Sequence, residues 1–181
     1  MDRVAGVDEA GRGAWAGPVV AAAVLLRGPV PGLADSKTLS SEKRKKAFFR
    51  LAENASWAVG FADKEEIEAR NIRLATFLAM QRAVAGLAIP LDKILVDGKE
   101  TPEFPVAAEA WVDGDARHEA IMAASIIAKC TRDQYMQTLE HLYPGYGFAR
   151  HKGYGTAWHR QALLALGPCR QHRLSFLKKV L

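Results

Sequence analysis

The chain contains 181 residues, of which 49% are hydrophobic and 25% are charged, and its formal net charge is +5. This length is sufficient for one domain with a substantial core, and the composition excludes a largely disordered chain. The longest apolar run, residues 14–26, contains Gly17 and Pro18 and is too short to cross a bilayer, so we expect no membrane association. Met1-Asp-Arg leads directly into the first expected strand, and two cysteines are too few for a disulfide framework. Both observations favour a cytoplasmic protein without a signal peptide.

Apolar runs and turn signals predict an α/β fold. Strands are expected at residues 4–9, 18–26, 56–61, 93–97 and 106–112. Helices are expected at residues 41–53, 64–86 with a break near Asn71, 116–141 and 157–166. Ser40 is suited to cap the first of these helices. Three hairpin-type strands, followed by strands that alternate with helices, imply one mixed sheet with helices on its faces.

Positive charge is concentrated in two regions. Residues 43–46 read Lys-Arg-Lys-Lys, and residues 141–181 contain seven Lys or Arg but no Asp or Glu. Aromatic residues are interleaved with the second group. A basic segment with aromatic side chains suits a polyanion that also offers flat faces for stacking, as nucleic acids do. The alternative is an ordinary solvated surface, which a modest charge excess alone does not exclude.

The chain is organised around its first motif, Val4-Ala-Gly-Val-Asp-Glu-Ala-Gly-Arg-Gly13. Because strand side chains alternate between faces, Asp8 and Glu9 converge on one site only if the strand ends or bulges there. The glycines on either side of Arg12 allow the backbone to approach a ligand closely, with a guanidinium between them. Carboxylates that could hold a divalent cation therefore lie beside donors suited to phosphate. A strand followed by a charged, glycine-rich turn is the alternative.

Two further acids stand at the ends of expected elements. Asp97 closes an apolar strand before Gly98, where a hairpin turn is the simple alternative, and Asp115 precedes the long helix, where Asp is a common N-cap. Acids that end separate strands of one sheet can share a rim, but they repel one another unless a cation neutralises them. An all-oxygen set favours Mg²⁺ or Mn²⁺, and two such ions can assist an in-line phosphoryl displacement.

Other chemistries are less well supported by the sequence. Asp133 lies about 27 Å along the helix from Asp115, too far to share its site, and it is expected to pair with Arg132 or Lys129. The five histidines lack the spacing of a zinc motif, and no serine stands in a Gly-x-Ser-x-Gly context. A zinc enzyme and a serine hydrolase are therefore disfavoured.

The motifs together resemble the ribonuclease HII family, the type 2 ribonucleases H. The matching pieces, in chain order, are Val7-Asp-Glu-Ala-Gly-Arg-Gly13, Ala16-Gly-Pro-Val-Val20, Asp35-Ser-Lys37, Val96-Asp-Gly98, Gly114-Asp-Ala116, Ala123-Ala-Ser-Ile-Ile-Ala-Lys129, Thr131-Arg-Asp133 and His151-Lys-Gly-Tyr-Gly-Thr156. The resemblance implies an RNase H-like fold, a five-stranded mixed sheet flanked by helices. It also implies metal-dependent hydrolysis of RNA in RNA/DNA hybrids and at single ribonucleotides in duplex DNA, leaving 3′-OH and 5′-phosphate ends.

The resemblance also assigns roles to individual residues. Asp8, Glu9, Asp97 and Asp115 are expected to be the catalytic carboxylates that bind two Mg²⁺ or Mn²⁺ ions. Gly11, Arg12 and Gly13 are expected to sense the ribose 2′-OH and the adjacent phosphate. Tyr154 is expected to stack on the sugar at the RNA–DNA junction, and Asp35, Ser36 and Lys37 are expected to contact the nucleic-acid backbone. We expect a monomer with a catalytic core at residues 1–142 and a basic C-terminal segment, residues 143–181, packed on it.

Three departures from the family pattern stand out. Ala14-Trp15 replaces the usual Pro-Leu and is expected to place a large ring near the site, Thr38 replaces a basic residue, and Asp113 replaces a Lys. None removes an expected catalytic acid. Two other functions fit parts of the sequence: a nucleic-acid-binding module whose acids only form turns and caps, and a DNA-directed nuclease or transferase on the same fold. Metal-dependent cleavage that requires a ribonucleotide distinguishes the three.

Overall fold

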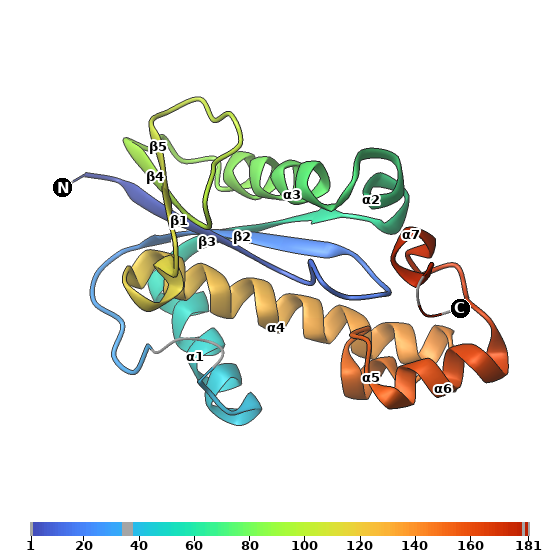
Figure 1. Cartoon of the computed structure of the whole chain (residues 1–181). Helices are drawn as coiled ribbons and strands as arrows, with labels where there is room; N and C mark the ends of the chain where they lie inside the picture. Colours follow the sequence, from blue (N-terminus) through green and yellow to red (C-terminus); the bar gives the residue numbers. More distant parts are fainter. Residues whose placement is uncertain (1, 34–37, 179, 181) are drawn as a thin grey trace.

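The computed structural model describes residues 2–33, 38–178 and 180 (Figure 1). Its strands are β1 (Val4–Ala10), β2 (Val19–Leu26), β3 (Ala55–Ala62), β4 (Lys93–Asp97) and β5 (Ala108–Trp111). Its helices are α1 (Ser41–Asn54), α2 (Lys64–Arg70), α3 (Ile72–Gly86), α4 (Glu119–Leu142), α5 (Phe148–His151), α6 (Ala157–Leu166) and α7 (Leu174–Leu177), with a 3-10 turn, η1 (Gly114–Ala116). The expected backbone contacts Asp35, Ser36 and Lys37 lie outside the described residues.

The five strands form one mixed sheet in the order β3-β2-β1-β4-β5. β1 pairs antiparallel with β2, and β2 pairs antiparallel with β3, whereas β4 runs parallel to both β1 and β5. In Figure 1, α3 covers one face of this sheet, and α1 and α4 cover the other. The predicted α/β class and mixed, helix-flanked sheet are therefore confirmed.

Most element boundaries follow local sequence signals. Ser40 caps α1, as predicted, because its hydroxyl accepts a hydrogen bond from the amide of Lys43 at 3.3 Å. The expected helix break is Asn71, whose backbone has φ +73° and whose side chain accepts the first amides of α3. The long helix begins at Glu119 rather than at residue 116, because residues 114–116 form the tighter turn η1. On α4, small residues that include Ala123 and Ala124 are fully buried.

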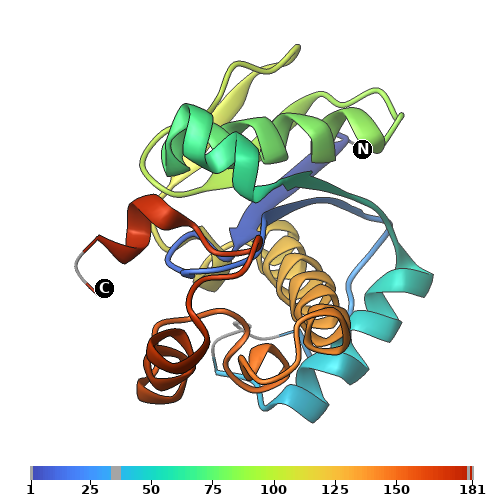
Figure 2. The same ribbon diagram turned by 90° about the vertical axis from the view of Figure 1, so that its right-hand side faces the viewer.

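The C-terminal segment packs beside the far half of α4, as the orange and red segments of Figure 2 show. A hydrophobic cluster joins Met136 and Leu139 of α4 to Phe148, to Leu163 and to Ala16, which lies in the loop after β1. The boundary expected between residues 142 and 143 remains a prediction. Among the described residues, no helix combines the length and apolar character needed to cross a membrane.

Candidate active site

A cavity of about 340 Å³ lies where β1 ends. Its lining residues are Asp8, Glu9, Ala10, Gly11, Arg12, Gly13, Arg44, Asp97, Ser125, Lys129 and Tyr154. It therefore brings together three of the four predicted acids, the whole Gly-Arg-Gly loop and the predicted junction-reading tyrosine. Asp115 does not line this cavity and lies just behind Asp97.

Strand pairing brings Asp8 and Asp97 to the same edge of the sheet. β1 and β4 run in parallel with Val7 opposite Val96, so the next residue on each strand is an aspartate. β1 stays regularly paired with β2 as far as Ala10, so the strand ends one residue after Glu9 without a bulge. Of the two geometries that could bring Asp8 and Glu9 to one site, the structure has the strand end. Carboxyl ends of parallel strands are where α/β sheets usually hold their ligands.

Burial and mutual repulsion make these carboxylates costly to ionise. Burial raises the pKa of Asp8 well above its ordinary value of 3.8, and the charges of Glu9 and Asp97 raise it further. Burial also raises the pKa of Glu9, although the Arg12 guanidinium opposes this. Glu9 Oε1 accepts a hydrogen bond from Arg12 at 3.3 Å, but its buried Oε2 has no hydrogen-bond partner among the described residues. The site is therefore short of positive charge.

Asp97 organises the turn that carries the fourth acid. Its Oδ1 accepts the backbone amides of Gly114 at 2.8 Å and Asp115 at 3.4 Å. Asp115 is only 2% exposed. Both simple alternatives for these acids are wrong, because β4 and β5 are parallel rather than a hairpin, and because the N-cap of α4 is His118 rather than Asp115. We call Asp8, Glu9, Asp97 and Asp115 the carboxylate rim.

The rim has suitable donor atoms for a hard divalent cation, but a complete set is not formed. Among the residues that the structure describes, no three His, Cys, Asp or Glu side chains lie close enough to form a metal-binding group. The donor chemistry nevertheless fits, because the acids are oxygen ligands, two have raised pKa values, and one buried oxygen lacks a partner. Assignment of these four residues as metal ligands remains a prediction.

The two glycines of the Gly-Arg-Gly loop differ in backbone conformation and in surroundings. Gly11 has φ +96°, and a side chain there would overlap the guanidinium of Arg132. Gly13 has no such conformation, and a side chain there would meet open space. Arg12 is exposed between them and pairs with Glu9. Only the first glycine is therefore required by the fold, and a role of the second in close approach to a ligand remains a prediction.

Two buried arginines that the sequence analysis did not identify hold this loop in place. Arg132 donates to the carbonyls of Pro18 at 2.9 Å, Lys152 at 2.9 Å and Ala16 at 3.0 Å. Arg173 donates to the carbonyls of Gly17 at 2.8 and 2.9 Å and of Arg12 at 3.0 Å. Both side chains are 0% exposed. We call Arg132 and Arg173 the arginine clamp. Their partners are backbone atoms far along the chain, so no local pattern predicts these contacts.

Asp133 pairs with Lys129 at 2.8 Å, one of the two partners expected for it. Both residues lie on α4, next to the predicted junction-reading tyrosine. The Tyr154 ring lies near two cations, with its centroid 5.6 Å from Lys129 Nζ and 5.3 Å from the Arg132 guanidinium carbon. Its carbonyl accepts a hydrogen bond from His159 Nδ1 at 2.9 Å. The predicted recognition residue is therefore held by both its ring and its backbone.

The three departures lie in different surroundings. Trp15 does not line the cavity of the rim; it packs on the C-terminal segment behind Tyr154, so it is near the site but outside it. Asp113 is exposed and lines a neighbouring cavity of about 430 Å³ with Arg12 and Asp97. Thr38 is also exposed.

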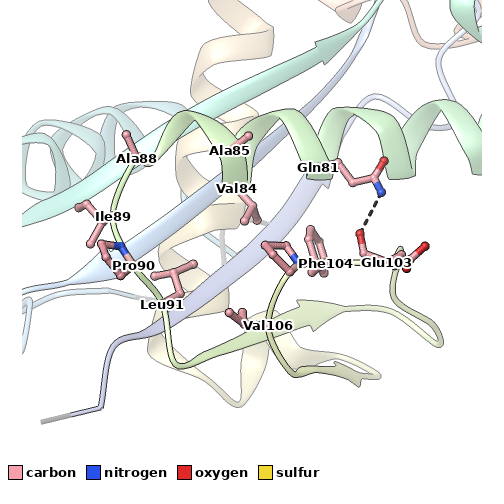
Figure 3. A pocket seen from close by; sticks show the side chains of 11 residues that line it. Gln81, Val84, Ala85, Ala88, Ile89, Pro90, Leu91, Glu103, Phe104 and Val106 are labelled. Atoms are coloured by element: carbon pink, nitrogen blue, oxygen red, sulfur yellow. Dashed lines mark hydrogen bonds between the residues drawn. The ribbon is translucent and has the colours of Figure 1, made fainter.

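A larger cavity, of about 670 Å³, lies elsewhere (Figure 3). The end of α3, residues 88–91 and residues 103–106 surround it, and its lining is mostly apolar. Glu103 is its one charged lining residue, and the carbonyl of Glu103 accepts a hydrogen bond from Gln81 at 2.9 Å. This cavity lacks the converging polar groups that catalysis requires, so size does not identify the active site here.

Known proteins share both this sequence and this fold. The family model of ribonuclease HII matches residues 5–179. A ribonuclease HII of Halorhodospira halophila is 58% identical over 177 residues, which cover 96% of this chain and 91% of that protein. A ribonuclease HII of Paracidovorax citrulli is 56% identical over 176 residues, which cover 96% and 73%.

Solved structures give the same result for the fold. The ribonuclease H2 of Pyrococcus horikoshii superimposes with a TM-score of 0.80 at 27% identity, covering 98% of this chain and 96% of that one. Bst-RNase HIII in complex with Mn²⁺ superimposes with a TM-score of 0.73 at 22% identity, covering 92% and 63%. The RNase H-like fold is therefore confirmed. With its fold, its motifs and its close relatives in agreement, this chain belongs to the ribonuclease HII family, endoribonucleases that act on RNA in RNA/DNA hybrids.

Proposed function

We propose that this nuclease also cleaves duplex DNA at single embedded ribonucleotides, on the 5′ side of the ribonucleotide. Water attacks the phosphorus in line with the departing 3′ oxygen, so the products carry 3′-OH and 5′-phosphate ends. One observation carries the proposal: the acids Asp8, Glu9 and Asp97 share a single cavity with the Gly-Arg-Gly loop and Tyr154. Groups suited to hydrolysis thus lie beside groups suited to recognition of one ribose.

The carboxylate rim would hold two Mg²⁺ or Mn²⁺ ions. The raised pKa values of Asp8 and Glu9 and the partnerless Oε2 of Glu9 support this, because each indicates missing positive charge. The Mn²⁺ complex of the RNase HIII neighbour is consistent with such ions in this fold. When bound, the ions would neutralise charge on the phosphate and lower the pKa of a bound water.

Side chains and backbone groups of the protein would recognise the ribonucleotide. The ribose 2′-OH alone distinguishes RNA from DNA at a given position, and the backbone of residues 11–13, which lines the cavity, suits a hydrogen bond to it. The Arg12 guanidinium, 53% exposed at its side chain, is placed to contact the adjacent phosphate. Tyr154 would stack on the sugar at the junction. Asp35, Ser36 and Lys37 would contact the sugar–phosphate backbone of the nucleic acid. Because none of the groups named here reads bases, the preference for a particular base sequence should be weak.

We further propose that the protein acts as a cytoplasmic monomer. Its substrates would be RNA/DNA hybrids and ribonucleotide-containing duplex DNA. The basic C-terminal segment would add phosphate contacts that position the duplex.

The test compares three labelled duplexes of one sequence: all DNA, DNA with one ribonucleotide, and a continuous RNA strand on DNA. With Mg²⁺ or Mn²⁺, we expect cleavage of the second and third only, and 3′-OH ends at the break. Cleavage of the all-DNA duplex would support a DNA-directed nuclease instead. Ends with 2′,3′-cyclic phosphate would mean that the 2′-OH itself attacks, which contradicts the proposal.

A further inference from the structure

Trp15 lies two residues after the Gly-Arg-Gly loop. Its backbone amide and its backbone carbonyl each form a hydrogen bond with the C-terminal segment. Its amide donates to the carbonyl of Gly153 at 2.8 Å, and its carbonyl accepts the amide of Arg173 at 2.7 Å. Gly153 directly precedes Tyr154. The residue that leaves the predicted 2′-OH-sensing loop is thus tied to the residue that enters the predicted junction-reading turn.

The indole of Trp15 lies against the other side of the same turn. A side chain on Gly155 would overlap the indole ring, so the glycine backbone rests directly on it. The indole centroid is 5.3 Å from the imidazole of His159, which in turn donates to the carbonyl of Tyr154 at 2.9 Å. Trp15 therefore contacts the turn at Gly153 and at Gly155. Through His159, it also supports the carbonyl of Tyr154 between them.

We propose that Trp15 is a positioning residue that sets the distance between Tyr154 and the Gly-Arg-Gly loop and thereby the preference for an isolated ribonucleotide. The inference rests on the proposed role of Tyr154. The leucine usual at this position is smaller and would leave space between residue 15 and Gly155. Since that backbone carries the Tyr154 ring, the ring would lose one of the contacts that fix its place relative to the 2′-OH.

The alternative is that Trp15 only fills the hydrophobic cluster to which it also belongs. A packing role would lower stability and reduce activity on all substrates alike. A positioning role changes the ratio between substrates, because a continuous RNA strand offers many registers for cleavage whereas a lone ribonucleotide offers one. A misplacement of about 1 Å can reduce a rate by about 100-fold.

The experiment measures kcat/KM for the single-ribonucleotide duplex and for the continuous hybrid in Trp15→Leu and Trp15→Phe. We expect Trp15→Leu to lower the ratio of the two values about tenfold, and Trp15→Phe, which restores a ring, to recover much of it. Trp57→Leu is the matched control, because Trp57 is also half-buried but packs on Phe48, away from the cavity. Melting temperatures of all variants report folding separately. An unchanged ratio in Trp15→Leu overturns the proposal.

A double variant separates this inference from the proposed function. If Trp15 acts through Tyr154, Trp15→Leu should not lower the ratio further in a Tyr154→Ala background. Additive losses would mean that Trp15 acts independently, and the inference would be wrong. If Tyr154→Ala alone leaves the ratio unchanged, the role proposed for Tyr154 fails. A loss of ratio in Tyr154→Ala but not in Trp15→Leu rejects only the inference about Trp15.

Discussion

The carboxylate rim and the arginine clamp are two groups of buried charge that meet at one loop, and they are balanced in opposite ways. In the rim, Asp8 and Glu9 have raised pKa values, and a buried oxygen of Glu9 has no hydrogen-bond partner among the described residues. In the clamp, Arg132 and Arg173 donate to five different backbone carbonyls. The carboxylates of the rim carry a cost of burial and repulsion, whereas the donors of the clamp are paired with the chain's own carbonyls.

This contrast suggests a functional role for the carboxylate rim and a structural role for the arginine clamp. Buried polar atoms normally have hydrogen-bond partners, so a buried carboxylate oxygen that lacks one is a place where a ligand is expected. Burial lowers the pKa of Arg173 to about 9, but its guanidinium donates hydrogen bonds to the carbonyls of Gly17 and Arg12. The rim should therefore respond to divalent cations and the clamp should not. Asp97→Asn and Arg132→Met test this difference, and two further predictions concern the histidines behind Tyr154 and Asp113 beside Arg12; they are given from the largest expected effect to the smallest.

Asp97→Asn should reduce hydrolysis by about 1,000-fold or more, because stabilisation of transition-state charge by metal ions is worth several kcal/mol. The asparagine oxygen can still accept the amides of Gly114 and Asp115, so the fold should persist. Cleavage of the single-ribonucleotide duplex measures the loss. Duplex binding in Ca²⁺ serves as the control and should be largely retained. Near-normal turnover would mean that Asp97 is only a turn residue.

The same variant tests the charge balance of the rim. Divalent cations should raise the melting temperature of the wild-type protein, since a ligand that binds only the folded state stabilises it. The increase in melting temperature should be smaller in Asp97→Asn, which has one charge fewer to bind the cations. In the presence of a chelator, the same substitution relieves the repulsion between residue 97 and Asp8.

Arg132→Met should destabilise the fold by about 3 kcal/mol, because it removes the donors to three buried carbonyls, each worth about 1–3 kcal/mol when left unsatisfied. Urea denaturation measures the change. The control is Lys129→Met on the same helix, which breaks a partly exposed ion pair and should cost about 1 kcal/mol or less. Equal effects of the two substitutions would show that the clamp is not the main support of the loop. Divalent cations should stabilise this variant and the wild type equally, so the difference between them should persist.

Acidification should weaken the region behind Tyr154. Burial lowers the pKa of His159 and of His172 to about 4, and their Nε2 atoms share a hydrogen bond of 3.0 Å. Between about pH 6.5 and 4 the unfolded histidines bind protons that the folded ones do not, so stability falls as pH falls through this window. The loss is at most about 3 kcal/mol for one histidine.

His172→Gln tests the assignment, because glutamine offers a similar donor to His159 but does not titrate. Unfolding free energies from pH 7 to 4.5 should decline less steeply in this variant than in the wild type. The acids Asp8 and Glu9 act in the opposite direction, since their raised pKa values favour the folded state as pH falls, and they are common to both proteins. Identical slopes would contradict the assignment.

Asp113→Lys should tighten duplex binding several-fold and steepen its dependence on salt by about 0.9 in log–log slope, the value for one added phosphate contact. Asp113 is exposed beside Arg12, so a lysine there can reach a bound duplex. Asp113→Asn is the matched control, because it removes the charge and suits the left-handed backbone of this position, φ +54°. It should change affinity without the added slope. An unchanged slope in Asp113→Lys would mean that residue 113 faces away from the duplex.

Local signals were sufficient to predict most of the fold. The helix expected at 157–166 is α6, because Thr156 supplies an N-cap hydroxyl and Gly167 follows the last turn. The acids Asp8, Glu9 and Asp97 were found because strand ends converge, a rule that needs no coordinates. The turn that carries Asp115 was not predicted, because it depends on hydrogen bonds to Asp97, 17 and 18 residues earlier.

The contacts of the arginine clamp could not be predicted from the sequence. Its acceptors are carbonyls, which every residue possesses, and they lie 114 to 161 positions away from the donors in five of the six bonds. The sequence predicts that Arg173, in the basic C-terminal segment, contacts nucleic acid and that Arg132 can pair with Asp133, yet both arginines are fully buried and donate to backbone carbonyls. Charge in a sequence therefore indicates a partner without showing whether that partner is a ligand or the chain itself.

The hydrogen bond from Arg173 to the Arg12 carbonyl spans 161 residues, and this has a consequence for biosynthesis. Ribosomes add about 5–20 residues per second, so roughly 10–30 seconds separate the appearance of the loop from that of its support. Until then, the carbonyls of Arg12 and Gly17 lack the side-chain donor that fixes them. The nascent chain should therefore assemble its sheet well before it gains the ability to cut, which delays nuclease activity until Arg173 has been synthesised.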